Sequence, residues 1–476
     1  MLSFNINKNF IVNPYQSVPI EQKKVDTTNG IPDDNITNIR SNIESKAIKN
    51  NYQASCYAKN YNINFCASLR TEEEKKKFND ITSKCDRETI KNLNFLLKTG
   101  VLQNNNSNDK TSVLDNLHKM ATTERIEGID NKKVLKETIE ALANPFSITQ
   151  KFGDIPSHIK NIIIENPKGF QTPVLSNNAV SNVFTNKTLS NQSSCCVAAS
   201  MEFNLAHKMP AEFTRMAEEL SSQKMQVTKK IKLNSISESK AEALTFLNEF
   251  KIPYKIDDWD RATVILKPDR NAIIKARIQS SYRNKNERSI IDVLMQSTFM
   301  NIGSQQTYNT LTDTSDSAFN LDKRGLTETE KNFTEAIVED KNKVSLIYQV
   351  LDENARLVDR ICDLKTIEKH IVDSVNSGHN VIVGITSFDN SNQVINGHEI
   401  TVIGVKKGLL GENIFICNDT DDNINSAIKI KASELIPSIH HAGIPKEVLK
   451  DSIEFIPAWE DTLDYVNTLK TSIDSM

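Results

Sequence analysis

The chain changes character along its length, and this change limits its possible folds more than any other feature. Most of the first two-thirds carries helical patterns, whereas short runs rich in Val and Ile follow one another closely from residue 380 to residue 431. Glycines and an Asp-Asp-Asn cluster separate these runs, as expected for turns between strands. Helices first and strands last predict an α+β chain with a largely antiparallel sheet.

Five strands are predicted, one over residues 344–350 and four more over 380–388, 399–405, 413–417 and 427–431. An amphipathic helix over residues 364–377 lies between the first and second strands, and Gly378 closes it. A short helix over residues 432–436 precedes His440 and His441, which we interpret as lining a cleft or lying on the surface. No partner spacing suggests a metal at these histidines.

Helices are predicted from apolar spacing and capping signals over 87–99, 131–144, 155–166, from the cysteine pair near residue 196, from Pro210, and over 289–302. Ser239 and Thr327 each begin a Ser/Thr-x-x-Glu capping box, which predicts two further helix starts. Residues 303–324 are polar and are expected to form a loop.

The 476 residues exceed one ordinary compact core, so we expect more than one part. Residues 1–50 are polar and without periodicity, which is typical of a disordered tail. Residues 51–166 are predicted to form a helical N-terminal domain, which could bind a protein partner or cover an active site as a propeptide does. Residues 167–476 then form the main domain.

Composition excludes several classes of protein. The net charge of −3 does not favour binding to nucleic acid, and no apolar run approaches the length of a membrane span, so we expect no membrane partner. No secretory leader pattern is present, which predicts a cytoplasmic location. The seven scattered cysteines do not suggest a disulfide framework, and no Cys or His spacing predicts a metal or another cofactor.

Two adjacent thiols, Cys195 and Cys196, precede an apolar stripe of Val197, Met201 and Leu205 at helical spacing. A thiol reacts as a thiolate, and the positive end of a helix dipole favours that anion. The alternative is that both cysteines are small core residues, since free cysteine is often buried. A histidine elsewhere in the chain is needed to favour the catalytic interpretation.

The run Ser-Cys-Cys-Val-Ala-Ala-Ser at residues 194–200 resembles the Ser-Cys-Trp-Ala-Phe-Ser segment of papain-type peptidases, with Cys196 as the nucleophile. It is also similar to the Cys-Gly-Pro-Ala segment of the bacteriocin-leader (double-glycine) peptidases, which would make Cys195 the nucleophile. The resemblance implies an oxyanion-hole role for Gln192. The family's glutamine usually lies further before its cysteine, and this spacing mildly favours Cys196.

The strand-rich end carries the matching histidine. Gly-His-Asn-Val-Ile-Val-Gly at residues 378–384 and Gly-His-Glu-Ile-Thr-Val-Ile-Gly at residues 397–404 resemble the C-terminal signature of the papain-like superfamily, with His398 as the base. His379, one strand earlier, is the best alternative. The run Ile-Phe-Ile-Cys-Asn-Asp at residues 414–419 resembles the segment that supplies the third catalytic residue. Strand parity favours Asn418 for that role, whereas the Asn-Asp pair favours Asp419.

The resemblance implies a papain-like cysteine peptidase fold, with helices packed on a C-terminal antiparallel sheet and a helical N-terminal extension. The separation of Cys196 from His398 exceeds the usual range of roughly 130–150 residues, which predicts an insertion around residues 260–345. The implied activity is thiol-dependent hydrolysis of a protein or peptide substrate. Acyl transfer or deamidation, and a non-catalytic binding protein with the same fold, are the alternatives.

Overall fold

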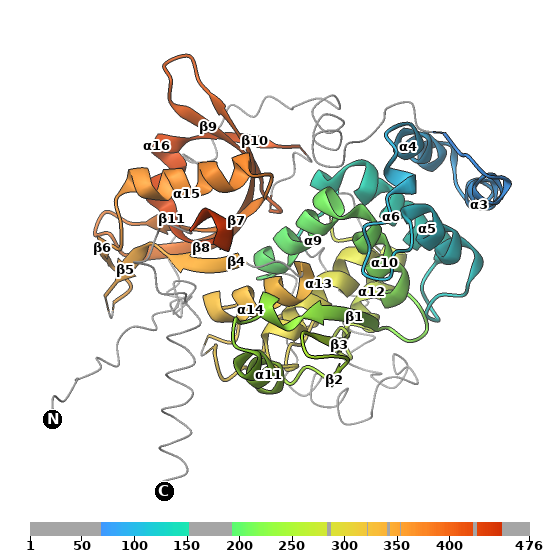
Figure 1. The fold of residues 1–476 in the computed structure, drawn as a ribbon, viewed down its shortest axis with the longest axis horizontal. Coiled ribbons are helices and arrows are strands. Elements are labelled where there is room, and N and C mark those ends of the chain that lie inside the picture. Colours follow the sequence, from blue (N-terminus) through green and yellow to red (C-terminus); the bar gives the residue numbers. More distant parts are fainter. Residues whose placement is uncertain are drawn as a thin grey trace, which may run out of the picture.

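The computed structural model describes residues 68–151, 193–282, 287–320, 322–339, 343–352, 354–421 and 426–449. The predicted tail over 1–50 and the predicted helix over 155–166 lie outside these residues. The protein combines α-helices with antiparallel sheets, which confirms the predicted α+β class (Figure 1).

The N-terminal helices are α3 (Glu72–Thr82), α4 (Arg87–Lys98), α5 (Val113–Thr122) and α6 (Asn131–Ala143), with short 3₁₀ turns at Val101–Gln103 and Pro145–Ser147. The helices predicted over 87–99 and 131–144 are therefore confirmed as α4 and α6. Gly100 has a φ of 76°, which ends α4 in the left-handed conformation that glycine adopts readily. The buried side chains of these helices belong to the same hydrophobic core as the central helices.

The central helices are α9 (Cys196–Lys208), α10 (Pro210–Leu220), α11 (Lys240–Glu249), α12 (Ala272–Tyr282), α13 (Ile290–Gly303) and α14 (Glu328–Glu339). Both predicted caps lie where expected: Ser239 accepts a hydrogen bond from the backbone N–H of Glu242, and Thr327 and Glu330 exchange hydrogen bonds between side chain and backbone. Ser289 also forms a capping box, with Asp292. Every residue of α13 is buried, and α9 and α14 both pack on this helix. The predicted insertion thus contributes α13 and α14 to the main core.

A small antiparallel sheet lies within this helical part, and the sequence analysis did not predict it. Its strands are β1 (Val227–Lys232), β2 (Tyr254–Ile256) and β3 (Arg261–Leu266), in the order β1-β3-β2. Residues of β1 alternate strictly between buried and exposed, with three lysines among the six residues. That alternation is the signal of a half-buried strand, and a 3₁₀ turn at Leu233–Ser235 follows it.

The main sheet has six antiparallel strands in the order β10-β9-β8-β7-β11-β4. They are β4 (Lys343–Ile347), β7 (Val381–Phe388), β8 (Val394–Lys407), β9 (Asn413–Asn418), β10 (Ile428–Lys431) and β11 (Ile439–Pro445). The four strands predicted between residues 380 and 431 are confirmed. The run predicted over 344–350 is divided between β4 and β5 (Gln349–Leu351), which pairs with β6 (Leu357–Arg360) in a separate ribbon.

His440 and His441 correct one interpretation. They lie on β11, a strand that was not predicted, and every residue of β11 is buried, so neither histidine is a surface residue. A buried strand in the interior of a sheet has no polar alternation that could reveal it in the sequence.

Helix α15 (Leu364–Asn376) covers one face of the main sheet, together with α16 (Ala432–Leu435) and 3₁₀ turns at Ile436–Ser438 and Lys446–Val448. Figure 1 shows α15 lying across the strands, and α9 and α14 on the side of the helical part that faces the sheet. Contacts of α9 with β7 and β8 bring the cysteine helix to the sheet that carries the predicted histidine.

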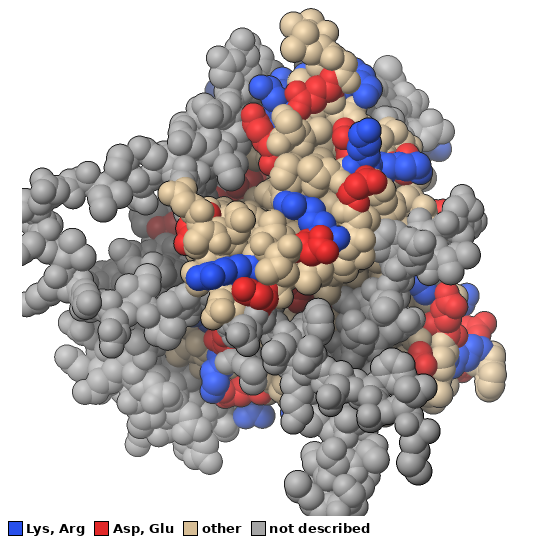
Figure 2. All heavy atoms as spheres, turned by 90° about the vertical axis from the view of Figure 1, so that its left-hand side faces the viewer, with Lys and Arg blue, Asp and Glu red and all other residues tan. Residues whose placement is uncertain are grey.

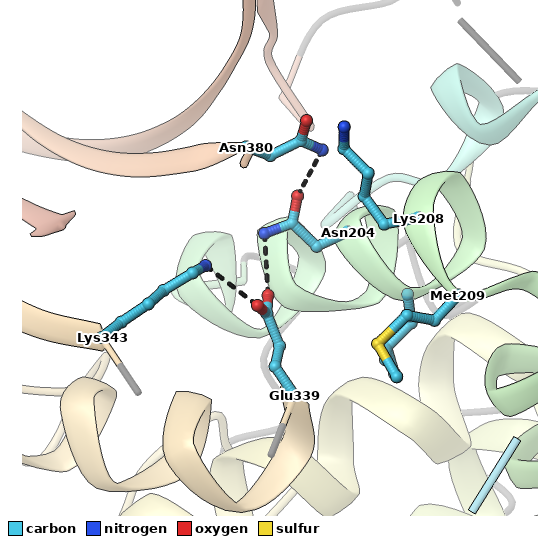
Figure 3. Close-up of a pocket in the computed structure, with 7 residues that line it drawn as sticks. Asn204, Lys208, Met209, Glu339, Lys343 and Asn380 are labelled. Carbon is cyan, nitrogen blue, oxygen red and sulfur yellow. Dashed lines mark hydrogen bonds and ion pairs between the residues drawn. The ribbon is translucent and has the colours of Figure 1, made fainter. Parts of the chain in front are cut away.

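A polar chain anchors the C-terminal end of α9. Asn380 at the start of β7 donates to Asn204 over 2.8 Å, and Asn204 donates to Glu339 at the end of α14 over 2.9 Å (Figure 3). Lys343 completes the chain with an ion pair of 2.9 Å to Glu339. These polar residues hold the C-terminal end of α9 in place, and they also line a small pocket. Cys196 lies at the other end of the helix, so this pocket is not the candidate active site.

Lysine, arginine and carboxylate side chains alternate over the described surface on the sheet side of the molecule (Figure 2). Among the described helices, none has both the length and the apolar composition needed to cross a bilayer.

Candidate active site

Cys196 is the first residue of α9, as the apolar stripe predicted. The first N–H groups of a helix have no partner within it, so they can stabilise an anion at the helix start. Cys196 is 8% exposed, whereas Cys195 is completely buried. Both cysteines are buried, and of the two predicted nucleophile candidates only Cys196 keeps some exposed surface.

Cys195 faces the protein interior. Its Sγ lies 3.1 Å from the hydroxyl of Tyr308 and 3.5 Å from a carboxylate oxygen of Asp313. Burial, with the negative charge of Asp313 adding to it, raises the pKa of the Cys195 thiol to about 11. This thiol stays protonated at neutral pH and has a structural role in the loop before α9.

Asp313 organises that loop from a distant part of the chain. One carboxylate oxygen accepts hydrogen bonds from the backbone N–H and the hydroxyl of Ser194, at 2.6 and 2.9 Å. The other accepts from Tyr308 at 2.8 Å. On the other side, the buried guanidinium of Arg288 donates to Ser193 over 2.8 Å. The predicted insertion therefore supplies the residues that hold the cysteine loop.

These supporting residues were missed by sequence reasoning. Asp313 and Tyr308 lie in a polar stretch with no helical or strand period, and Arg288 precedes a helix cap. Nothing local distinguishes them from surface loop residues, since only the tertiary packing buries them.

His398 lies on β8 and contacts both other members of the predicted triad. Its Nε2 is 2.8 Å from Oδ1 of Asp419, and its imidazole also interacts with the thiol of Cys196. Burial lowers the pKa of His398, but the charge and hydrogen bond of Asp419, together with the contact to Cys196, raise this pKa well above its ordinary value. The arrangement favours the charged, imidazolium form of His398.

Asn418 and Asp419 lie at the end of β9 and have different surroundings. The strand ends at Asn418, so its alternation does not extend to the next residue. Asn418 pairs with Thr401 and is buried, and within the described part of the chain its Nδ2 donates no hydrogen bond. Asp419 contacts His398, and Asn418 does not.

The remaining predicted candidates lie elsewhere. Gln192 is outside the described residues, so its oxyanion role stays a prediction. His379, the alternative histidine, interacts with Glu447 over 2.8 Å at the start of the sheet.

Searches against known protein families, characterised proteins and solved structures found no match. The chemistry of the site is therefore inferred from its own residues. A thiol at a helix start, an imidazole in contact with it and a carboxylate on a ring nitrogen are the parts that covalent acyl chemistry requires.

Proposed function

We propose that this protein is a cysteine-dependent hydrolase that cleaves an amide bond of a protein or peptide substrate. One observation carries the proposal: His398 contacts the thiol of Cys196 and is bound to Asp419 through its Nε2. The same ring thus has a nucleophile on one side and an orienting carboxylate on the other, which is the arrangement of a thiol–imidazole–carboxylate triad.

The reaction would proceed in two steps. The Cys196 thiolate attacks the substrate carbonyl carbon, and the imidazolium of His398 donates its proton to the leaving amine. Water then attacks the thioester, and neutral His398 accepts a proton from that water before the thiol is released. Asp419 holds the ring in position and stabilises its charged form throughout. Backbone N–H groups at the start of α9 are suited to the oxyanion.

A papain-like fold is part of this proposal. Its support is the chain order of Cys196, His398 and Asp419, together with a cysteine-bearing helix packed on antiparallel strands that carry the other two residues. The group of helices that packs with α9 is larger than the resemblance implies. Helices α3 to α6 and α10 to α14 all contribute buried side chains to the same hydrophobic core as α9.

A single labelling experiment tests the proposal. The full-length protein is treated near neutral pH with a peptidyl epoxide or iodoacetamide, and the modified residue is identified by mass spectrometry. We expect selective modification of Cys196 in the wild type, and at least about 100-fold slower labelling in His398→Ala. Labelling of Cys196 no faster than that of Cys85 or Cys362, both partly exposed, would contradict the proposal and favour a non-catalytic protein.

Product analysis then identifies the reaction. A peptide library should yield new N-termini if water is the acceptor. Release of ammonia without chain cleavage would indicate deamidation instead, and a product joined to an added amine would indicate acyl transfer.

A further inference from the structure

Three potential metal ligands meet at a second place in the protein, which we call the His–Glu cluster: Glu328, His440 and His441. Glu328 is the first residue of α14, and both histidines lie on β11. One ligand atom from each residue lies within 4.8 Å of the others. These residues take no part in the proposed triad.

The distances within the cluster match the spacing of ligands around one metal ion. The two Nδ1 atoms are 3.0 Å apart, and Oε1 of Glu328 is 3.4 Å from Nδ1 of His440 and 3.7 Å from Nδ1 of His441. Bonds of about 2.0–2.1 Å in a tetrahedral site place ligand atoms roughly 3.3–3.4 Å apart. A small shift of one ring would therefore complete the geometry.

A β-bulge makes the meeting of two adjacent histidines possible. Neighbouring side chains in a regular strand point to opposite faces of the sheet. The pairing of β11 with β7 shifts register between Ile439 and His441, and such a bulge re-aims side chains. On β7, Gly384 lies opposite His441, and a Cβ atom there would overlap the imidazole ring. The backbone is thus shaped to hold this ring.

A carboxylate behind the cluster orients His441. Oε1 of Glu399 lies 2.6 Å from Nε2 of His441, and Lys331 lies 3.3 Å from the other oxygen of Glu399. A proton on Nε2 would face this carboxylate and would leave the Nδ1 lone pair to the cluster. A carboxylate on the outer nitrogen of a metal-binding histidine is the usual arrangement, because it fixes the tautomer and raises the basicity of the ligand.

The ligand side chains of the cluster are largely enclosed by the protein. His440 and His441 are 5% and 1% exposed. Neutral imidazole is the form that binds metals. Oε1 of Glu328 accepts no hydrogen bond from the part of the chain that the structure describes. A buried carboxylate oxygen without a hydrogen-bond donor is costly, and a bound cation would offset that cost.

We propose that Nδ1 of His440, Nδ1 of His441 and Oε1 of Glu328 bind a divalent transition-metal ion of the Zn²⁺ type. Two imidazoles and one carboxylate suit such an ion, and water would take a fourth position. The ion would link the start of α14 to β11. Through Glu399 it would also support β8, where Glu399 directly follows His398. The proposal does not depend on the triad being catalytic.

Zinc binding by full-length protein tests the site. The parent is Cys196→Ala, which removes the other thiol–imidazole pair that could bind zinc. After treatment with a chelator and dialysis, the protein is titrated with Zn²⁺ in competition with a chromophoric chelator. We expect one tight equivalent in the parent and at least about 100-fold weaker binding in Glu328→Gln and His440→Gln. His379→Gln, a histidine outside the cluster, should bind as the parent does.

Two further measurements separate ligand loss from misfolding. Glu399→Gln leaves all three ligands in place and should weaken binding by about 10–100-fold, as loss of an outer-shell partner does. X-ray absorption at the zinc edge of the parent needs no variant and should show nitrogen and oxygen ligands without sulfur. Absence of a tight equivalent, sulfur ligation in the parent, or unchanged affinity in folded Glu328→Gln and His440→Gln would each overturn the proposal.

Discussion

Nε2 of His398 lies 2.8 Å from Oδ1 of Asp419. Because the carboxylate engages this ring nitrogen, Nδ1 is the ring nitrogen left for the contact with Cys196. The His398–Asp419 pair links β8 to the end of β9, and the contact of His398 with Cys196 links β8 to the start of α9.

The two adjacent thiols should behave oppositely. Cys196→Ala should abolish selective labelling and reduce any hydrolysis by at least about 1,000-fold, since the nucleophile is lost. Cys195→Ala should keep the labelling rate within about threefold, because the pKa of Cys195 is about 11 and its thiol faces Tyr308 and Asp313. Pseudo-first-order alkylation rates measure both. Labelling that is lost in Cys195→Ala, with the protein still folded, would assign the nucleophile to Cys195.

Asp419 and Asn418 provide a matched pair for the third position. Asp419→Asn removes the charge that stabilises the His398 imidazolium, so we expect kcat or the alkylation rate to fall by about 10²–10⁴-fold. Asn418→Ala removes a buried side chain that does not contact His398, so it should lower the free energy of unfolding with little change in rate. The reverse result in folded variants would place Asn418 in the triad.

The charge on His398 should give a pH-dependent stability. The pKa of His398 is raised above its ordinary value of 6.5, so the folded protein binds this proton more tightly than the unfolded chain. The resulting stabilisation is complete below about pH 6.5 and is lost as pH rises through the raised folded value. Urea unfolding should therefore show His398→Gln most destabilised, relative to wild type, near pH 6, with a smaller difference in alkaline solution. If the stability difference between wild type and His398→Gln grew with rising pH, that result would contradict a charged His398 in the folded protein.

Asp313 should be essential for the cysteine loop. Asp313→Ala removes the acceptor of hydrogen bonds from Ser194 and Tyr308, and we expect the free energy of unfolding to fall by about 3–5 kcal/mol. The alkylation rate of Cys196 should fall with it. Asp316→Ala in the same loop breaks only an exposed ion pair with Lys323 and should cost less than about 1 kcal/mol. Equal effects in the two variants would show that Asp313 does not support the loop.

Glu330 should make the protein less stable as pH rises. Burial raises the pKa of this carboxyl from 4.5 to about 7, although Ser317 and Thr327 are bonded to it. The folded state therefore prefers the protonated form, and stability should fall by roughly 3 kcal/mol as pH rises from about 4.5 to above 7. In Glu330→Gln, the free energy of unfolding measured with denaturant should not show this part of the fall with rising pH. Glu72→Gln, at an exposed position, should follow wild type.

Local signals in the sequence predicted much of the fold. The caps at Ser239 and Thr327 and the Val/Ile runs of β7 to β10 identified their elements, because each signal acts within a few residues. The sequence patterns did not reveal elements whose formation depends on distant segments. The sheet of β1 to β3 and the interior strand β11 were missed, since pairing and burial there depend on distant segments.

The sequence by itself determined which residues are available for chemistry: two thiols before an apolar helix, a histidine before an apolar strand, and an Asn-Asp pair at the end of the next strand. Only the tertiary structure separated Cys196 from Cys195 and Asp419 from Asn418. It also brought Glu328 to His440 and His441. The reason is physical: propensity and periodicity act along the chain, whereas burial, charge and hydrogen bonding at a site depend on contacts between segments distant in sequence.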